Sequence, residues 1–427
     1  MTQPRRHNVA VLGLGYVGLP LAVAAAQAGH RVWGYDVNFE RVHDLDSGVP
    51  GVEDVTELDL KHVLASSHLR VTTDPAELAS CDTYVICVPT PLRDRIPDLS
   101  MVLEAVETVA SVVSPGNLVI LESTTYPGTT EEIVAPRIEA LSGLSTPDDY
   151  YLVFSPERID PGNSSFQLKN TPKVVGGIGG GATELAMSFY GSFIHDVRPV
   201  SRPRQAEMAK LLENTFRHVN IALVNEMAAF CAELDIDLWE VIEAAASKPF
   251  GFMPFRPGPG VGGHCIPIDP AYLSWRVRRL GYPFRFVELA CEINEGMPDY
   301  VALRAADVLN TVGKPLKGST ILMLGVAYKP DVADVRESPA HALARKLGTR
   351  GAKLAWHDPY VQRFDVDGAT LERVDDLAPD DLRAADLVLI HTDHSCYDWD
   401  AVVDHAQLVF DTRNATRARC QPHVVRL

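Results

Sequence analysis

The chain has 427 residues, of which 46% are hydrophobic and 22% charged, and this composition is typical of a globular protein with more than one domain. Its formal net charge of −17 argues against a nucleic-acid partner, because phosphate binding needs concentrated Lys and Arg. A small anionic ligand is compatible with this charge, since helix N-termini and local basic groups act at short range. The chain lacks a stretch of about 18 uninterrupted apolar residues, so we expect no membrane span.

The N-terminal segment and the cysteines favour a cytoplasmic protein. Arg5 and Arg6 precede an apolar run, as in a signal peptide, but glycines interrupt that run and it continues into a nucleotide-binding pattern. We therefore expect no export. The seven cysteines are odd in number and show no metal-ligand spacing, which favours reduced thiols and no metal site.

The N-terminal part alternates short apolar runs with helical sequence. Asn8 to Leu12 reads as a strand, an alanine-rich helical segment follows to Ala28, and Arg31 to Tyr35 reads as the next strand. Further strands are predicted at Thr83 to Val88, Leu118 to Glu122 and Tyr151 to Phe154. Alternation of this kind predicts a parallel, doubly wound sheet.

The first strand ends in a GxGxxG motif formed by Gly13, Gly15 and Gly18. Such glycines allow a tight turn and bring a pyrophosphate close to a helix N-terminus. Asp36 ends the second strand, where its carboxylate would accept both ribose hydroxyls of NAD and repel the 2′-phosphate of NADP. The alternative is a purely structural turn, but the strand, helix and acidic residue together predict NAD binding.

A long helix without Gly or Pro is predicted from Arg204 to about Leu234. Its apolar residues at helical spacing are Met208, Leu211, Leu212, Phe216, Val219 and Leu223. Lys210, Asn214 and Arg217 project from the opposite face, at positions i, i+4 and i+7. They are either part of a site or the exposed polar face of a surface helix.

Three further segments carry candidate chemistry. The glycine-rich run from Gly260 to Pro270 places Cys265 four residues before Asp269, which suggests a nucleophile with an acid/base neighbour. The alternatives are a packed thiol and a turn aspartate. Glu157 and Thr124 each follow a predicted strand, at the sheet edge where α/β proteins bind ligands.

The C-terminal part echoes the N-terminal part strand by strand. The echoing segments are Thr320 to Gly325, Ala355 to Asp358, Ala385 to Ile390 and Leu408 to Asp411. Only Gly325 of the glycine triad survives there, and Lys329 appears instead. We predict an α/β protein with two Rossmann-like doubly wound domains, residues 1–201 and 301–427, joined by a central long-helix domain, residues 202–300.

With these motifs in place, the chain resembles the UDP-glucose/GDP-mannose dehydrogenase family over essentially its whole length. The matching segments are Gly13 to Gly18, Val88 to Pro91, Leu121 to Thr124, Ser155 to Arg158, Glu207 to Asn214, Gly260 to Asp269 and Tyr328 to Ser338. Within the family it looks most like the UDP-N-acetylglucosamine 6-dehydrogenases. The finer match lies in Leu121 to Glu132, Ser155 to Asn163, Lys248 to Phe252 and His264 to Asp269.

The resemblance implies an NAD-dependent, four-electron oxidation of C6 of a UDP-hexose to the uronic acid. The Cys265 thiolate would attack a C6 aldehyde, hydride loss from the thiohemiacetal would give a thioester, and water would hydrolyse it. The resemblance assigns the catalytic roles to Cys265, Lys210, Asp269, Asn214, Glu157 and Thr124. Lys210 and Asn214 would stabilise and position oxyanions, while Asp269, Glu157 and Thr124 would share protons and the water in a division left open.

The resemblance also assigns the binding residues. The expected NAD contacts are Gly13, Gly15, Tyr16, Val17, Gly18, Asp36, Arg41, Pro89, Thr90, Thr124 and Arg336. The expected UDP-sugar contacts are Glu157, Arg158, Lys210, Asn214, Arg217, Gly260, Gly262, Lys329 and Arg413. The family usually dimerises through its long central helix, so at least a homodimer is expected.

The identity of the substrate, the role of Arg217 and a non-catalytic function stay open at this point. UDP-glucose and UDP-N-acetylmannosamine 6-dehydrogenases use the same catalytic set, and a thymidine diphosphate sugar is also compatible with the sequence. An N-acetyl group could be met by Arg217 and His218, although Arg217 could equally be a surface or dimer-interface residue. A non-catalytic sensor on the same fold could lose Cys265 without penalty, so the intact catalytic set argues against it.

Overall fold

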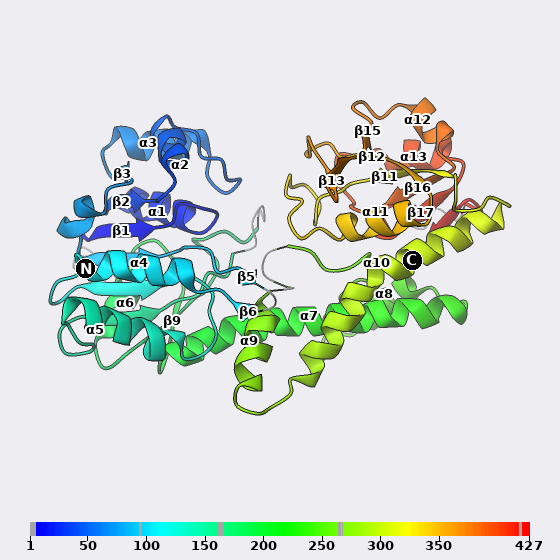
Figure 1. The fold of residues 1–427 in the computed structure, drawn as a ribbon. Coiled ribbons are helices and arrows are strands. Elements are labelled where there is room, and N and C mark those ends of the chain that lie inside the picture. Colours follow the sequence, from blue (N-terminus) through cyan, green and yellow to red (C-terminus); the bar gives the residue numbers. More distant parts are fainter. Residues whose placement is uncertain (1–5, 94–95, 160–164, 264–265, 267, 418–420) are drawn as a thin grey trace. The chain divides into compact units, whose positions relative to one another are not determined.

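The computed structural model describes residues 6–93, 96–159, 165–263, 266, 268–417 and 421–427. The chain divides into two compact units, each built around its own sheet (Figure 1). The first unit contains Met1–Glu213 and Ala271–Tyr282, and the second contains Asn214–Pro270 and Pro283–Leu427.

An eight-stranded sheet forms the centre of the described part of the first unit. Its strands, in spatial order, are β10 (Val197–Val200), β9 (Lys173–Gly177), β8 (Tyr151–Phe154), β7 (Leu118–Leu121), β4 (Thr83–Ile86), β1 (Asn8–Leu12), β2 (Arg31–Tyr35) and β3 (Leu69–Thr72). Neighbours run parallel except β8 and β9, which are antiparallel. From β3 to β8 the order is that of a doubly wound nucleotide-binding sheet, with its switch point between β1 and β4.

Helices cover both faces of this sheet, so its strands are apolar on both sides. The helices are α1 (Gly18–Gln27), α2 (Phe39–Asp46), α3 (Glu57–Ala65), α4 (Ser100–Ala110), α5 (Ala135–Ser142) and α6 (Ala182–Tyr190). Val9 and Val11 of β1 belong to one buried cluster, with α1 and α6, while Ala10 and Leu12 belong to another, with α4 and α5. A 3₁₀ turn (Pro75–Ser80), a π turn (Thr130–Val134) and the short pair β5 (Leu92–Arg93) and β6 (Ile96–Pro97) complete these elements.

The described part of the second unit contains a six-stranded, all-parallel sheet with the same winding order. Its strands are β15 (Glu372–Arg373), β12 (Lys353–His357), β11 (Thr320–Leu324), β16 (Leu387–Ile390), β17 (Val409–Asp411) and β18 (Val424–Arg426). The helices α11 (Pro339–Thr349), α12 (Pro379–Ala384) and α13 (Trp399–His405) pack around it, and β13 (Asp365–Val366) pairs with β14 (Ala369–Thr370).

Four helices lie between the two sheets in the sequence: α7 (Pro203–Glu233), α8 (Leu238–Ala246), α9 (Asp269–Arg278) and α10 (Arg285–Thr311). The predicted fold class is therefore confirmed, and the predicted strands and long helix agree with the structure to within a few residues. The antiparallel β9 was not predicted. The three-part boundaries stay a prediction, and among the described residues no helix is both long and apolar enough to span a membrane.

Candidate active site

The glycine loop lies at the carboxyl end of β1, beside the switch point of the first sheet. Gly13 has a φ of +89°, and a Cβ on Gly18 would lie 1.8 Å from the carbonyl oxygen of Gly13, so neither position accepts a side chain. A Cβ on Gly15 would meet nothing within 4 Å, and α1 begins after Val17 without a side-chain cap. This open loop at an uncapped helix N-terminus fits the pyrophosphate of NAD.

Asp36 holds the same loop in place. Its Oδ2 accepts a hydrogen bond from the backbone N of Leu14 at 2.9 Å, and its Oδ1 accepts one from the backbone N of Asn38 at 2.9 Å. Arg41 donates from its guanidinium to the Leu14 carbonyl oxygen, at 3.0 and 2.8 Å. Burial lowers the pKa of Arg41, and Asp36 opposes that shift. A carboxylate can accept about four hydrogen bonds, so Asp36 still has capacity for a ribose.

The other predicted NAD residues of the first unit lie around this edge. Tyr16 is 42% exposed and Val17 is half-buried, both in the glycine loop. Pro89 and Thr90 follow β4, the strand beside β1, and the Thr90 carbonyl oxygen accepts a hydrogen bond from the Tyr272 hydroxyl at 2.8 Å. The loops after β1 and β4 therefore meet at the sheet edge where a dinucleotide is expected.

Thr124 and Glu157 follow β7 and β8, so they lie along the same carboxyl edge. Thr124 is half-buried, and the Glu157 carboxylate is 12% exposed. Oε1 of Glu157 accepts hydrogen bonds from the backbone N of Arg158 and of Ile159, both at 2.6 Å. Oε2 of Glu157 lies 3.4 Å from Nζ of Lys173.

Lys173 belongs to none of the motifs predicted from the sequence. It is the first residue of β9, and its ammonium also forms an ion pair with Glu122 at 2.9 Å. The lysine could have been noticed because it opens an otherwise apolar run, Val174 to Gly177, but its partners lie far away in sequence.

Arg158 makes structural contacts within the protein, so its guanidinium is not reserved for a ligand. Its guanidinium forms an ion pair with Glu213 on α7 at 2.7 Å and donates to the Pro172 carbonyl oxygen at 2.6 Å. A UDP-sugar can therefore be bound only by those N–H groups of the Arg158 guanidinium that do not contact Glu213 or Pro172.

On α7 two of the three predicted polar site residues are buried, and much of the apolar face is exposed. Lys210 is 8% exposed and Asn214 is 5% exposed, which is inconsistent with the exposed polar face of a surface helix. Leu212 and Leu223 are 58% and 53% exposed. Among the described residues, Lys210 has neither a hydrogen-bond acceptor nor an ion-pair partner.

Asn214 and Asp269 contact one another within the second unit. The Asn214 amide donates to Oδ2 of Asp269 at 2.5 Å, and Asp269 is 4% exposed at the start of α9. The predicted nucleophile, Cys265, lies outside the described residues, as do His264 and Pro267.

The glycine run before Cys265 packs against the loop that follows β11. A Cβ on Gly262 would lie 2.8 Å from Cβ of Tyr328 and 2.9 Å from the Glu337 carbonyl oxygen. Gly260 has a φ of +133°, where a side chain is strained. Lys329 follows Tyr328, and its ammonium lies 5.7 Å from the centre of that ring. The second unit thus brings the predicted substrate residues Gly260, Gly262 and Lys329 together.

Arg413, which follows β17, lies close to the start of the same glycine-rich segment. A Cβ on Gly258 would lie 2.5 Å from its guanidinium, and its Nε donates to the His391 carbonyl oxygen at 2.8 Å. Burial lowers the pKa of Arg413, opposed by Asp393 and Asp411. Arg336, expected to reach a phosphate of NAD, belongs to the second unit and pairs with Asp334 in its own loop at 2.7 Å.

Arg217 and His218 are neighbours on α7, but their side chains lie in different environments. Arg217 is exposed, while His218 is 2% exposed and its Nε2 lies 3.5 Å from Sγ of Cys291. His218 also contacts Asn294 of α10, so it packs between two helices and is not presented with Arg217.

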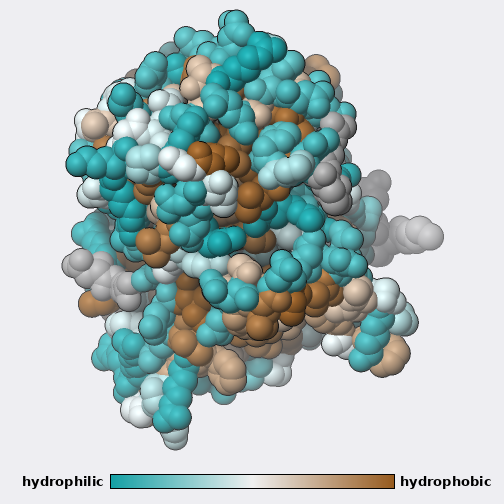
Figure 2. Space-filling view, turned by 90° about the vertical axis from the view of Figure 1, so that its right-hand side faces the viewer, coloured by the Kyte–Doolittle hydropathy of each residue, from teal (hydrophilic) through white to brown (hydrophobic). Residues whose placement is uncertain are grey.

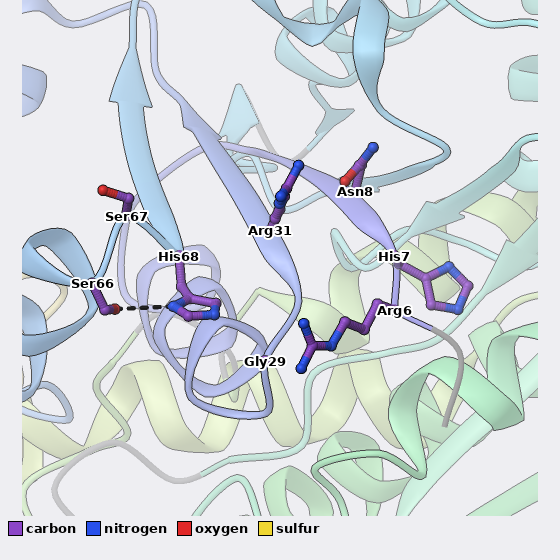
Figure 3. A pocket seen from close by; sticks show the side chains of 8 residues that line it. All are labelled: Arg6, His7, Asn8, Gly29, Arg31, Ser66, Ser67 and His68. Carbon is purple, nitrogen blue, oxygen red and sulfur yellow. Dashed lines mark hydrogen bonds between the residues drawn. The ribbon is translucent and has the colours of Figure 1, made fainter. Parts of the chain in front are cut away.

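The first unit also contains a pocket of about 380 Å³, which lies at the amino ends of the strands, opposite the glycine loop (Figure 3). Asn8 and Arg31, which begin β1 and β2, line it together with His68, which precedes β3. Gly29 and Ser66, just beyond the ends of α1 and α3, are also in its wall. Basic side chains there complement the negative ends of two helices, which accounts for them without a ligand.

Comparisons with known proteins agree with this arrangement. Residues 7–194, 204–296 and 322–418 match the NAD binding, central and UDP binding domain models of the UDP-glucose/GDP-mannose dehydrogenase family. The chain is 37% identical to the UDP-N-acetyl-D-glucosamine 6-dehydrogenase of Salmonella typhi, over 84% of each chain. It is 36% identical to the UDP-N-acetyl-D-mannosamine dehydrogenase of Pyrococcus horikoshii, over 95% of each chain.

Solved structures give the same picture. The UDP-D-ManNAc dehydrogenase from Pyrococcus horikoshii superposes with a TM-score of 0.88 at 34% identity, covering 98% of each chain. A UDP-glucose dehydrogenase from Pyrobaculum islandicum superposes with a TM-score of 0.87 at 29% identity, covering 99% of this chain and 98% of the other.

Proposed function

Because the chain belongs to the UDP-glucose/GDP-mannose dehydrogenase family and is an NAD-dependent nucleotide-sugar dehydrogenase, we propose that it oxidises C6 of a UDP-N-acetylhexosamine to the carboxylate. The observation that supports this chemistry best is the burial of Lys210. An ammonium at 8% exposure, without an anionic partner among the described residues, is available for negative charge that develops on a ligand oxygen.

The reaction is balanced as two oxidations and one hydrolysis. One hydroxymethyl group, one water and two NAD⁺ give one carboxylate, two NADH and three protons. NAD⁺, when bound at the glycine loop, supplies the hydride acceptor for each oxidation. A nucleophile is required between them, because an aldehyde loses hydride only after it becomes tetrahedral, and the Cys265 thiol meets that need.

The residues of the chain then divide the work. Lys210 stabilises the oxyanion at C6, and Asn214 positions Asp269, to which it donates a hydrogen bond. Glu157, with Thr124 nearby on the same sheet edge, accepts the proton of the water that attacks the thioester. The Cys265 thiolate leaves and regains its proton.

The second sheet supplies the proposed UDP-sugar site. The Gly260 and Gly262 backbone, Lys329 and Arg413 all belong to the second unit, and the two basic groups suit a diphosphate. Arg158 and Arg217 are proposed as additional sugar-nucleotide contacts. Arg336 is proposed for a cofactor phosphate, in exchange for its ion pair with Asp334.

The hexose has two candidates. The sequence motifs favour UDP-N-acetylglucosamine, and the Salmonella typhi relative is named for that sugar. UDP-N-acetylmannosamine is the second candidate, supported by relatives and solved structures that match nearly the whole chain. The two sugars differ only in configuration at C2, the carbon that bears the acetamido group.

The deciding experiment is a panel of sugar nucleotides scored for NADH at 340 nm. The panel contains UDP-N-acetylglucosamine, UDP-N-acetylmannosamine, UDP-glucose and one thymidine diphosphate sugar, each with NAD⁺. We expect two NADH per sugar consumed with an N-acetylated UDP-hexose. A higher kcat/KM for UDP-glucose would refute the substrate assignment, and no NADH from any sugar would refute the enzyme assignment.

We also propose a homodimer that covers the exposed apolar face of α7. Its members with large exposed side chains are Met208, Leu212, Phe216, Leu223 and Phe230. Figure 2 shows patches of hydrophobic side chains on one side of the molecule. Residues 1–201, 202–300 and 301–427 are the proposed cofactor, helical and UDP-sugar segments.

A further inference from the structure

We propose that Lys173 is a positioning residue that sets the orientation of the Glu157 carboxylate, and that Glu122 in turn holds the Lys173 ammonium. This inference rests on the proposed role of Glu157 as the base that activates the hydrolytic water. It adds two residues to the reaction that touch neither substrate nor cofactor.

The antiparallel strand places Lys173 beside Glu157. β8 pairs with β9 through Val153 with Gly177 and Phe154 with Gly176. Continuing this register by three residues sets position 173 opposite position 157. A parallel strand in the place of β9 would start at the other edge of the sheet, so the one break in the parallel order brings the lysine to the edge where ligands bind.

Glu157 needs such an anchor because it lies in a loop. Two of its contacts, the backbone N of Arg158 and of Ile159, come from the same loop and move with it. Among the described residues, only Lys173 contacts this carboxylate from outside the loop, at 3.4 Å from Oε2. The ion pair with Lys173, which is fixed in the sheet, therefore orients Oε2 of Glu157.

The Lys173 ammonium is itself fixed by a buried chain of contacts. The Lys173 side chain is 3% exposed, and its Nζ lies 2.9 Å from Oε2 of Glu122, whose side chain is 0% exposed. The Tyr190 hydroxyl, on α6, donates to Oε1 of Glu122. Burial alone would lower the pKa of Lys173, but Glu122 and Glu157 outweigh it and raise that pKa, so the amine is cationic at neutral pH.

Stability alone is a weak reason for this arrangement. Desolvating a buried ion pair costs about as much as the pair regains, and apolar residues of similar volume often serve stability as well. Burial is the largest influence on Glu122 and raises its pKa, while Lys173 opposes that shift, so burial disfavours the charged form of this carboxyl. A carboxylate aimed at the ligand edge explains why the cluster is charged.

The test uses a variant that removes both buried charges together, Glu122→Gln with Lys173→Met. The new amide can still accept a hydrogen bond from the Tyr190 hydroxyl, and position 122, which is fully buried, no longer carries a carboxylate that needs a counter-ion. Lys169→Met, at an exposed lysine of the preceding segment, is the matched control. Lys173→Arg, which keeps the charge, is the rescue variant. NADH formation, KM for NAD⁺, melting temperature and intact mass after mixing with sugar nucleotide and NAD⁺ are measured for each.

We expect kcat of the double variant to fall about 10- to 100-fold, because a displaced base loses much of its effect, while KM for NAD⁺ changes less than about twofold. An acyl-enzyme adduct is expected to accumulate by mass. Lys173→Arg should recover most of kcat. Adding Glu157→Gln should lower kcat no further than Glu157→Gln does alone, since both changes remove the same function.

Unchanged kcat in the double variant, or losses that multiply with Glu157→Gln, would overturn the positioning role while leaving the proposed function intact. A wild-type protein that forms no NADH with any sugar nucleotide would refute both. If the double variant does not fold, Lys173→Met alone is measured in the same way, since the raised pKa of Glu122 allows its carboxyl to take up a proton. The same loss of kcat and the same adduct are expected.

Discussion

The amide of Asn214 donates a hydrogen bond to Oδ2 of Asp269 at 2.5 Å, in a setting where both side chains are at most 5% exposed. One residue is on α7 and the other begins α9, so the contact ties the helix that carries Lys210 to the segment that follows Cys265. A carboxylate held by an amide donor can still accept or release a proton in a reaction, which is the role proposed for Asp269.

Asp269→Asn tests that role. The substitution keeps the shape of the side chain but removes the charge and one acceptor, so we expect kcat to fall about 10²- to 10⁴-fold, the usual range for loss of an acid or base. KM for NAD⁺ should be little affected. Steady-state kinetics is compared with Asp404→Asn, an exposed aspartate on α13. Wild-type kcat in Asp269→Asn would remove this carboxylate from the mechanism.

Asp36 should determine both cofactor preference and loop order, because its carboxylate also holds the backbone N of Leu14. Asp36→Ala is expected to lower the preference for NAD⁺ over NADP⁺ and to weaken binding of both cofactors. Asp36→Asn keeps one acceptor and should lose less NAD⁺ affinity. Cofactor titrations by intrinsic fluorescence check this. Equal kcat/KM for NAD⁺ and NADP⁺ in the wild type would contradict the assignment.

Cys265 is expected to carry the acyl group through the second oxidation. Cys265→Ser should lose steady-state turnover, because a hydroxyl is a poorer nucleophile near neutral pH and its oxygen ester is hydrolysed more slowly than a thioester. Intact mass after incubation with substrate is the measurement, with Cys265→Ala as the control that forms no adduct. NAD⁺ binding should survive in both. Near wild-type uronate formation by Cys265→Ala would rule out the thiol.

His218 should make the protein less stable in acid. Burial lowers the pKa of His218 to about 4, from 6.5 for an exposed histidine. The unfolded chain therefore binds the proton more readily, so the contribution of neutral His218 is fully present above pH 6.5 and is lost as the pH falls toward 4. Linkage predicts a loss of about 2 kcal/mol between pH 7 and pH 5.

Denaturant unfolding of the wild type and of His218→Gln at the two pH values isolates this contribution from the carboxylates, which the two proteins share. The pH-dependent loss should be smaller in His218→Gln by about the same 2 kcal/mol. An identical pH dependence in both proteins would show that the fold does not lower the pKa of His218.

The exposed side chains of α7 predict the oligomeric state. Leu212→Glu with Leu223→Glu places two charges on the proposed interface, and burying unpaired charges disfavours association. Light scattering after size exclusion should show a dimer for the wild type and a monomer for the variant. Leu58→Glu, at an 80% exposed leucine of α3, is the control. A monomeric wild type at micromolar concentration would reject the interface.

Much of this protein could be predicted from its sequence because the informative signals are local. The glycine loop, Asp36 and the alternation of strands and helices each depend on neighbours within a few tens of residues, and the order of the two sheets follows from that alternation. The long helix was also predictable, since α7 spans nearly the residues that lack Gly and Pro.

The tertiary structure decided which groups are buried and which distant groups meet. The helical pattern of α7 shows two faces but not which one is covered, and here Lys210 is buried while Leu212 is exposed. Lys173 lies 51 residues from Glu122 in the sequence, on a strand that runs antiparallel to its neighbour β8, so no local pattern joins the two residues. Long-range contacts of this kind depend on strand direction and register, which the chain acquires only when the sheet forms.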